Sequence, residues 1–224
     1  MAIPQTACTP EKIFLAVMLP LVLRENERIL ENRERLNTLL VDDQRSPRDN
    51  RWLRVRTVDY GVKPDDWTAL LDRMDAVPPA LGLAQAAIES GWGGSRFAAE
   101  GNALFGQWTQ VSGQGIVPER RAATSRHEVR KFRNIGASVT AYLRNLNTHM
   151  AYTDFRSLRS KIRSEGGAIT GQEAAGTLIH YAETGSDYVV LLSEVMVTNE
   201  LGRFDPAKLT PQKGAFKWKG IQSR

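Results

Sequence analysis

LAQAAIESGWGGSRFAAEGNALFGQW, residues 83–108, joins an apolar helical run to an abrupt glycine-rich break. The run reaches Glu89 and Ser90 and then meets three glycines within residues 91–94, which surround Trp92. Two prolines at 78–79 precede it, and proline suits the first turn of a helix. The sequence therefore predicts a helix that begins at Pro79 and ends on a carboxylate next to an indole.

The position of Glu89 on this helix predicts that its carboxyl group is half-buried. Leu81, Ala84, Gln85 and Ile88 fall on one stripe, and Glu89 lies one turn beyond Gln85 at the edge of that stripe. Desolvation against Trp92 and the negative end of the helix dipole are both expected to raise the pKa of Glu89. A glutamate that stays protonated near neutral pH can act as a general acid.

The residues after the glycines are suited to binding a sugar. Trp92, Phe105 and Trp108 offer flat apolar rings for stacking, and the amides of Asn102 and Gln107 can bond hydroxyl or acetamido groups. The alternative is structural: Glu89 ends a helix and the aromatic residues belong to the core. The combination of the carboxylate, the glycines and GNALFGQW favours a ligand site.

Outward from this stretch, helical spacing dominates the chain. We expect an N-terminal helical segment and connector over 1–63, with a helix over about 10–41 that kinks or restarts at Pro20. A second, mostly helical domain follows over 64–202, and a tail over 203–224. Short alternating runs over about 111–133 predict a small β-hairpin lobe beside the cleft. The predicted fold class is mainly α (α+β).

The composition limits which partners, cofactors and membrane segments can be expected. The 224 residues are 42% apolar and 25% charged, with a net charge of +5, which permits nucleic acid, anionic lipid or an acidic polymer such as a bacterial wall as partner. Cys8 is the only cysteine, and His127, His149 and His180 are widely spaced, so neither a disulfide framework nor a metal or other cofactor is expected. Residues 13–23 are apolar but too short to span a membrane and lack the features of a signal peptide, so a signal for export would lie outside this sequence.

Residues 84–108 resemble the signature of the bacterial glucosaminidases, glycoside hydrolase family 73, and most closely its Bax-type branch. Residues 19–30, 127–156 and 181–196 are also similar to that branch, so the resemblance covers roughly 10–200. It implies a lysozyme-like helical fold with a small β-lobe, and cleavage of peptidoglycan after N-acetylglucosamine in a bacterial cell envelope. Glu89 matches the family's catalytic glutamate, and Tyr181 and Tyr188 match tyrosines that line its cleft. Ala103 stands where many relatives have a second asparagine.

A second catalytic carboxylate is left open. Glycoside cleavage usually needs a partner acid, and the resemblance implies a position in the β-lobe, where Glu119 and Glu128 are the candidates. Each can instead be a hairpin residue paired with nearby arginines. A third route needs no second acid, because the acetamido oxygen of the substrate can attack the anomeric carbon.

Four functions are compared. The first is an endo-β-N-acetylglucosaminidase acting on peptidoglycan with Glu89 as general acid. The second is a lytic transglycosylase, and the third is a catalytically inactive wall-binding protein. The fourth, a nucleic-acid binder, ranks last because no recognised nucleic-acid motif accompanies the charge.

The basic β-lobe can attract an anionic wall polymer or be an ordinary exposed hairpin; its basic residues are Arg120, Arg121, Arg126, Arg130, Lys131 and Arg133. The oligomeric state is not predicted.

Overall fold

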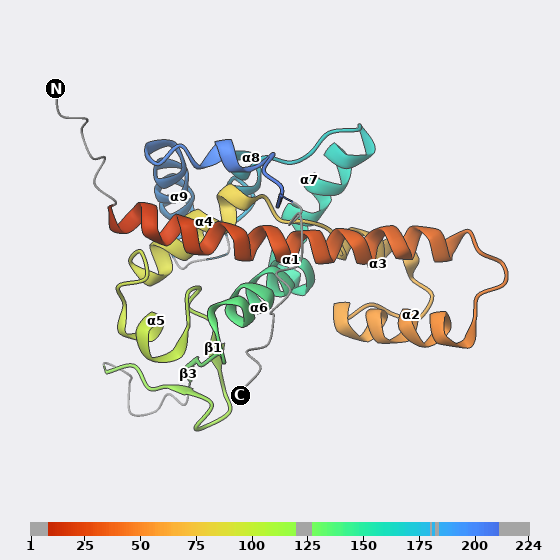
Figure 1. Ribbon diagram of the computed structural model, residues 1–224, viewed down its shortest axis with the longest axis horizontal. Coiled ribbons are helices and arrows are strands. Elements are labelled where there is room, and N and C mark those ends of the chain that lie inside the picture. Colours follow the sequence, from red (N-terminus) through yellow and green to blue (C-terminus); the bar gives the residue numbers. More distant parts are fainter. Residues whose placement is uncertain (1–8, 120–126, 180, 182–183, 211–224) are drawn as a thin grey trace, which may run out of the picture.

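The computed structural model describes residues 9–119, 127–179, 181 and 184–210. Cys8, His180, Arg120, Arg121 and Arg126 lie outside these residues, as does 211–224 of the predicted tail. The predicted mainly α class is confirmed (Figure 1). The elements in chain order are α1 (Pro10–Leu40), α2 (Pro47–Tyr60), α3 (Trp67–Arg73), α4 (Pro79–Ser90), α5 (Arg96–Gly101), β1 (Trp108–Thr109), β2 (Gly115–Ile116), β3 (Glu128–Arg130), α6 (Ile135–Thr148), the 3-10 turn η1 (Met150–Tyr152), α7 (Thr153–Ser164), α8 (Gly171–Ala175), α9 (Ser186–Thr198) and the 3-10 turn η2 (Leu201–Phe204).

Helix α1 runs along most of the length of the molecule (Figure 1). Thr9 caps its N-terminus by accepting a hydrogen bond from the backbone N–H of Lys12. The predicted helix over about 10–41 is confirmed, but it is one helix and does not restart at Pro20. Pro20 lies on the exposed side of α1, where water can bond the carbonyl that a missing N–H leaves free. Phe14, Met18 and Val22 continue the buried face past it.

Helix α4 is the centre of the core. Each of its residues from Pro79 to Ala87 is buried, because α1, α8, α9 and η2 all pack on it. The sequence predicts a single apolar stripe, and the structure shows instead a helix that is covered on every side. Residues of α1 pack into the same core as α4, so 10–40 and the helix that carries Glu89 share one hydrophobic interior. The boundaries at 63 and 202 stay a prediction.

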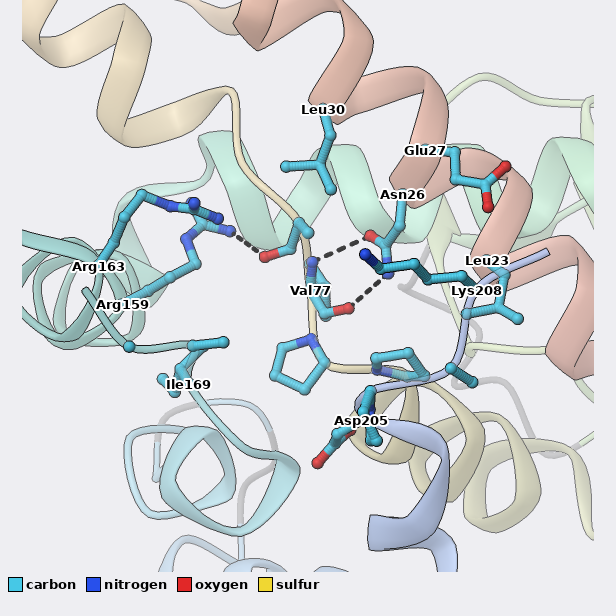
Figure 2. A pocket seen from close by; sticks show the side chains of 17 residues that line it. Leu23, Asn26, Glu27, Leu30, Val77, Arg159, Arg163, Ile169, Asp205 and Lys208 are labelled. Atoms are coloured by element: carbon cyan, nitrogen blue, oxygen red, sulfur yellow. Dashed lines mark hydrogen bonds between the residues drawn. The ribbon is translucent and has the colours of Figure 1, made fainter. Parts of the chain in front are cut away.

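The connector over 74–78 leads into α4 and is held from two sides. From α1, the Asn26 side chain donates to the carbonyl of Val77 (2.7 Å) and accepts from its N–H (3.0 Å). From α7, the Arg159 guanidinium donates to the carbonyls of Asp75 and Ala76. Figure 2 shows these side chains around a mainly apolar cavity of about 530 Å³ between α1, the connector and residues 205–208. The start of α4 is therefore fixed by buried polar contacts.

The β-lobe is a three-stranded antiparallel sheet in the order β1-β3-β2, and it lies below α5 and α6 in Figure 1. It begins at Trp108, three residues before the predicted start, and β3 lies between the two earlier strands. Gly115 is required in β2, because a Cβ there would lie 2.5 Å from the carbonyl oxygen of Val129. The lobe is tied to α5 by the bond from the Phe132 N–H to the Gly101 carbonyl (2.8 Å).

Candidate active site

Glu89 lies in the last turn of α4, as predicted. Gly91 ends the helix in a left-handed conformation (φ 55°) that suits glycine, and its N–H bonds back to the carbonyls of Ala87 and Ile88. Ser90 stabilises the same turn by donating to the Ala86 carbonyl (2.6 Å) and accepting from the Gly93 N–H (2.8 Å). The half-buried Glu89 carboxyl is thereby held on a rigid helix end.

The Glu89 carboxyl lies in a cleft of about 600 Å³, which we call the acid cleft. The β-lobe contributes residues to it, as the resemblance implies for a lysozyme-like fold. Gly106 comes close to the acid, since a Cβ there would lie 3.2 Å from Glu89 Oε2. The cleft is lined by Glu89, Phe105, Gly106, Gln107, Trp108, Arg130, Ala141, Tyr142, Arg144, Asn145, Thr148, Tyr152 and Tyr181.

A chain of hydrogen bonds runs behind the acid. The Tyr188 hydroxyl donates to Glu89 Oε1 (3.1 Å) and accepts from Gln85 Nε2 (3.0 Å). The Tyr142 hydroxyl donates to Gln85 Oε1 (2.5 Å). Gln85, Tyr142 and Tyr188 are all buried. Helices α4, α6 and α9 thus meet next to Glu89 through polar contacts in the core.

Two effects act on the pKa of Glu89. Burial raises the pKa of this carboxyl group, because the charged form is poorly solvated there. The hydrogen bond from Tyr188 acts in the opposite direction, since it stabilises the carboxylate, but burial is the larger effect. The pKa is raised, as the sequence predicts, which suits a general acid.

Trp92 lies away from the acid cleft. Its ring packs edge-on against Phe14 of α1, with ring centroids 5.6 Å apart, and Trp92 is not among the residues that line the acid cleft. The reason is the backbone: Trp92 adopts a left-handed conformation (φ 55°) and bonds through its N–H to the Ala87 carbonyl, so its side chain extends towards α1. The aromatic group bonded to Glu89 is Tyr188 instead.

Asn102 also lies away from the acid cleft. It caps the C-terminus of α5 in a left-handed conformation (φ 51°), and its side-chain amide donates to the Phe132 carbonyl (2.9 Å). It does not line the acid cleft. Its amide ties α5 to the β-lobe and is not presented to a ligand in that cleft.

The other predicted binding residues lie at the acid cleft with different roles. Trp108 is 56% exposed and offers a ring at the rim. Phe105 is buried and stacks on Tyr142 with ring centroids 3.9 Å apart, so it forms a floor and not an open stacking surface. Tyr181 stacks on Tyr188 (5.2 Å between centroids) and donates to the Phe105 carbonyl. Tyr188 lies behind the lining residues and reaches the cleft through Glu89.

Gln107 lines the acid cleft, and its side-chain oxygen is not used as a hydrogen-bond acceptor by any described residue. Its backbone carbonyl accepts from the Arg130 N–H, which fixes it beside β3. Its side-chain Oε1 is buried and, within the part of the chain that the structure describes, has no hydrogen-bond partner.

Neither candidate for a second acid lines the acid cleft. The Glu119 side chain is 81% exposed and pairs with Arg96 (3.5 Å). Glu128 is only 5% exposed, and its carboxylate accepts hydrogen bonds from the backbone N–H groups of Gly113 and Gly115. Its place in β3 directs the side chain to the turn before β2. Among the described residues that line the cleft, Glu89 is the only carboxylate.

Several residues at the cleft were not predicted from the sequence. Tyr142, Tyr152, Arg144 and Asn145 lie at the cleft, on α6 and η1. Gln85 carried the clearest signal, because a polar residue within an apolar helical run needs a buried partner. Nothing in the local pattern indicates that the partners come from residues 142 and 188.

The structure also bears on metal binding and on a membrane span. The residues with a described placement contain no group of three or more histidine, cysteine, aspartate or glutamate side chains able to hold a metal ion. In the same part of the chain, no helix has both the length and the apolar character needed to cross a bilayer.

Replacing Tyr188 by phenylalanine is expected to move the basic limb of the pH–activity profile to higher pH. A general acid works only while protonated, so activity falls as the pH rises through the raised pKa of Glu89. The variant removes the hydrogen bond that lowers this pKa, so Glu89 stays protonated up to a higher pH. The measurement is kcat/KM against pH. Trp92→Ala is the matched control and leaves the limb in place; a limb that stays in place in Tyr188→Phe would contradict the assignment.

The fold and the site together define a class: a mainly helical protein that holds one protonatable carboxyl group in a polar cleft beside a small β-lobe. Residues 66–201 match the family model for glucosaminidases, described as mannosyl-glycoprotein endo-beta-N-acetylglucosaminidase. The chain belongs to the glucosaminidase family, as the resemblance of residues 84–108 implies.

Two known proteins are similar to the chain. Protein bax of Escherichia coli strain K12 is 31% identical over 184 residues, which are 80% of this chain and 65% of that protein. The match to the Bax-type branch is thereby confirmed. The catalytic domain of the autolysin Auto from Listeria monocytogenes matches with 17% identity and a TM-score of 0.43, over 78% of this chain and 97% of that domain.

Proposed function

We propose that the chain is a peptidoglycan hydrolase of the bacterial cell envelope, an endo-β-N-acetylglucosaminidase with Glu89 as its general acid. The observation that carries this proposal is the Glu89 carboxyl group, half-buried on a rigid helix end, with a raised pKa and access to a cleft of about 600 Å³. Membership of the glucosaminidase family supports the same chemistry.

The first chemical step is proton transfer. The neutral Glu89 gives its proton to the glycosidic oxygen as the bond from that oxygen to the anomeric carbon breaks, and the leaving sugar departs as an alcohol. Oε2 is suited to this role, since it lies beside Gly106 of the cleft while Oε1 is bonded to Tyr188. Glu89 is left as a carboxylate that can later accept a proton from water.

The nucleophile in this proposal is the acetamido oxygen of the substrate. Glu119 and Glu128 are held elsewhere by Arg96 and by backbone N–H groups. The acetamido oxygen bonds to the anomeric carbon as the leaving group departs, giving a cyclic cation. Water then attacks the same carbon, Glu89 takes a proton from it, and the product is a strand with N-acetylglucosamine at its reducing end.

The same observation supports a second candidate, a lytic transglycosylase. This reaction also needs one acid, and the described lining residues of the cleft contain one carboxylate. It closes the muramic residue into an anhydro ring and uses no water. Mass spectrometry of digested wall distinguishes the two: N-acetylglucosamine at the reducing end supports the hydrolase, and anhydromuramic ends support the transglycosylase. Binding to insoluble wall without any cleaved product would identify a wall-binding protein.

Two guanidinium groups favour an acidic glycan over a neutral one. Arg130 and Arg144 both line the acid cleft. Arg144 is already bonded to the Asp59 carbonyl (2.6 Å), whereas Arg130 is exposed and lies over the Phe132 ring (5.0 Å). The stem peptides of peptidoglycan carry free carboxylates, so Arg130 has a suitable charge for this polymer.

Replacing Arg130 by alanine is therefore expected to raise KM for peptidoglycan about two- to fivefold, the effect of one exposed ion pair. KM for a neutral N-acetylglucosamine oligomer should not change. The control is Arg133→Ala, since Arg133 is an exposed arginine outside the acid cleft. Equal effects on the acidic and the neutral substrate, or equal effects of the two variants, would contradict recognition of carboxylates by Arg130.

A further inference from the structure

Gln85 is a buried polar side chain that the proposed chemistry does not use. It lies on α4 one turn before Glu89 and makes two hydrogen bonds, one to Tyr142 of α6 and one to Tyr188 of α9. The partners lie 57 and 103 residues away along the chain. A fully buried amide in the central helix has a large desolvation cost, which these two bonds offset.

The direction of each bond in this chain follows from the groups. A phenol has one hydrogen to donate, and an amide side chain has a carbonyl oxygen that accepts and an NH₂ that donates. The Tyr142 hydroxyl is buried, and its hydrogen bond to Gln85 Oε1 is the one it donates among the described residues. The reverse direction would leave this buried hydrogen without an acceptor. Tyr142 therefore fixes which end of the Gln85 amide faces Tyr188.

The orientation of the amide fixes the direction of the next bond. Gln85 presents Nε2, a donor, to the Tyr188 oxygen, so the Tyr188 hydrogen must point to another acceptor. That acceptor is Glu89 Oε1 at 3.1 Å. A carboxylic acid accepts a hydrogen bond better through its carbonyl oxygen than through its hydroxyl oxygen, so the Tyr188 hydrogen at Oε1 favours the neutral acid in which Oε1 is the carbonyl oxygen. The proton of that acid then lies on Oε2, the oxygen beside Gly106 in the acid cleft.

We propose that Gln85 is a positioning residue, which together with Tyr142 sets the direction of the hydrogen-bond chain so that the proton of Glu89 is held on Oε2. This inference rests on the proposed function, in which Oε2 gives its proton to the glycosidic oxygen. Gln85 acts only through Tyr188. With Gln85 replaced by an apolar residue, Tyr188 can rotate, and the neutral acid can carry its proton on the unproductive Oε1.

The titratable and charged groups near the acid come from several elements. Tyr188 lies on α9, Tyr142 and Arg144 on α6, and Arg130 on β3. Tyr152 and Tyr181 also line the acid cleft. Of these groups, only Tyr142 is replaced in the variants described below. A shift in the titration of Glu89 can therefore be assigned to the hydrogen-bond chain of Tyr142, Gln85 and Tyr188.

The experiment compares Gln85→Leu, Tyr142→Phe and the double variant. Each single variant is expected to lower kcat about three- to tenfold, the effect of misdirecting one neutral hydrogen bond. Each should also move the basic limb of the pH profile to higher pH, because the donor to the charged form of Glu89 is no longer fixed. The double variant should match Gln85→Leu alone, since Tyr142 acts through Gln85.

Tyr60→Phe is the matched control. Tyr60 is a buried tyrosine of α2 that is not part of the hydrogen-bond chain behind Glu89. Removing its hydroxyl group should leave the basic limb of the pH profile unchanged. A purely structural role for Gln85 would give additive losses of kcat and an unmoved limb, and this result would overturn the inference. If Gln85→Leu does not fold, Tyr142→Phe alone decides, since it removes a single oxygen atom.

A second measurement does not depend on activity. The ¹³C titration of the Glu89 carboxyl group should move to higher pH in Tyr142→Phe and stay in place in Tyr60→Phe. An unmoved titration in Tyr142→Phe would overturn the inference. Failure of the proposed function gives a different result, which is wild-type protein without any cleaved glycan product.

Discussion

Replacing Glu89 by glutamine is expected to lower kcat for peptidoglycan cleavage by about 10²–10⁴-fold, the usual contribution of a general acid. Glutamine has nearly the same size and can still accept the hydrogen bond from Tyr188, but it has no proton that it can give to a glycosidic oxygen. The measurement is the release of soluble fragments from purified wall, together with a thermal melt that shows an intact fold.

Glu119→Gln and Glu128→Gln are the matched comparisons. Glu119 is exposed, and its ion pair with Arg96 contributes little, so its variant should keep activity within about twofold. Glu128→Gln should mainly lower stability, since two backbone N–H groups lose a charged acceptor. Full activity in Glu89→Gln would contradict its role. A loss in Glu119→Gln as large as that in Glu89→Gln would identify Glu119 as a second catalytic carboxylate.

Replacing Asp75 by alanine is expected to lower the free energy of unfolding by about 3–5 kcal/mol, the cost of breaking a buried ion pair from one side. Asp75 is 2% exposed and pairs with Arg163 (2.5 Å). Arg159 and Arg33 each have a guanidinium nitrogen 3.9 Å from the same carboxylate. Burial lowers the pKa of Arg159 to about 10, so this buried group keeps its charge at neutral pH and needs Asp75 nearby.

The loss of Asp75 should also affect α4, the helix that carries Glu89. Arg159 donates to the carbonyls of Asp75 and Ala76 in the connector that leads into α4, and to the carbonyl of Asp72 near the end of α3. Figure 2 shows Arg159 beside this connector. The measurement is urea unfolding at pH 7. The control is Arg203→Ala, which removes an exposed pair with Glu200 and should change stability by less than about 0.5 kcal/mol. A change below about 1 kcal/mol in Asp75→Ala would mean that the cluster does not hold the connector.

Local signals predicted much of the helical frame. The spacing of the leucines predicted the extent of α1, and Pro79 and the glycines of residues 91–94 predicted both ends of α4. The half-buried position of Glu89 followed from its spacing to Gln85 on a helix. These features depend on residues within a few turns, and the physical rules for caps and periodicity act at that range.

Three of the predicted site residues lie away from the acid cleft, and local backbone structure explains where each of them lies. Asn102 looked like a ligand-binding amide, but its left-handed backbone and its bond to the Phe132 carbonyl make it a cap. Glu128 looked like an acid, but two N–H groups of the next turn hold it. Trp92 is adjacent to the catalytic helix in sequence, and its turn carries the ring to α1. Sequence patterns do not distinguish these uses.

The contacts of longest range could not be predicted. Gln85 and Tyr188 are 103 residues apart and meet only because α4 and α9 pack together. The two tyrosines implied by the family resemblance, Tyr181 and Tyr188, are both near the acid, but only the structure shows that one bonds to Glu89 and that the other stacks on its partner.

The most direct test of the account is an NMR titration of the Glu89 side chain in wild-type protein carrying ¹³C-labelled glutamate, with Glu89→Gln used to assign the signal. We expect this carboxyl group to ionise at higher pH than a glutamate side chain free in water, because burial raises its pKa. Titration of Glu89 at or below the pH of a free glutamate would contradict a protonated acid in the cleft, and with it the proposed chemistry.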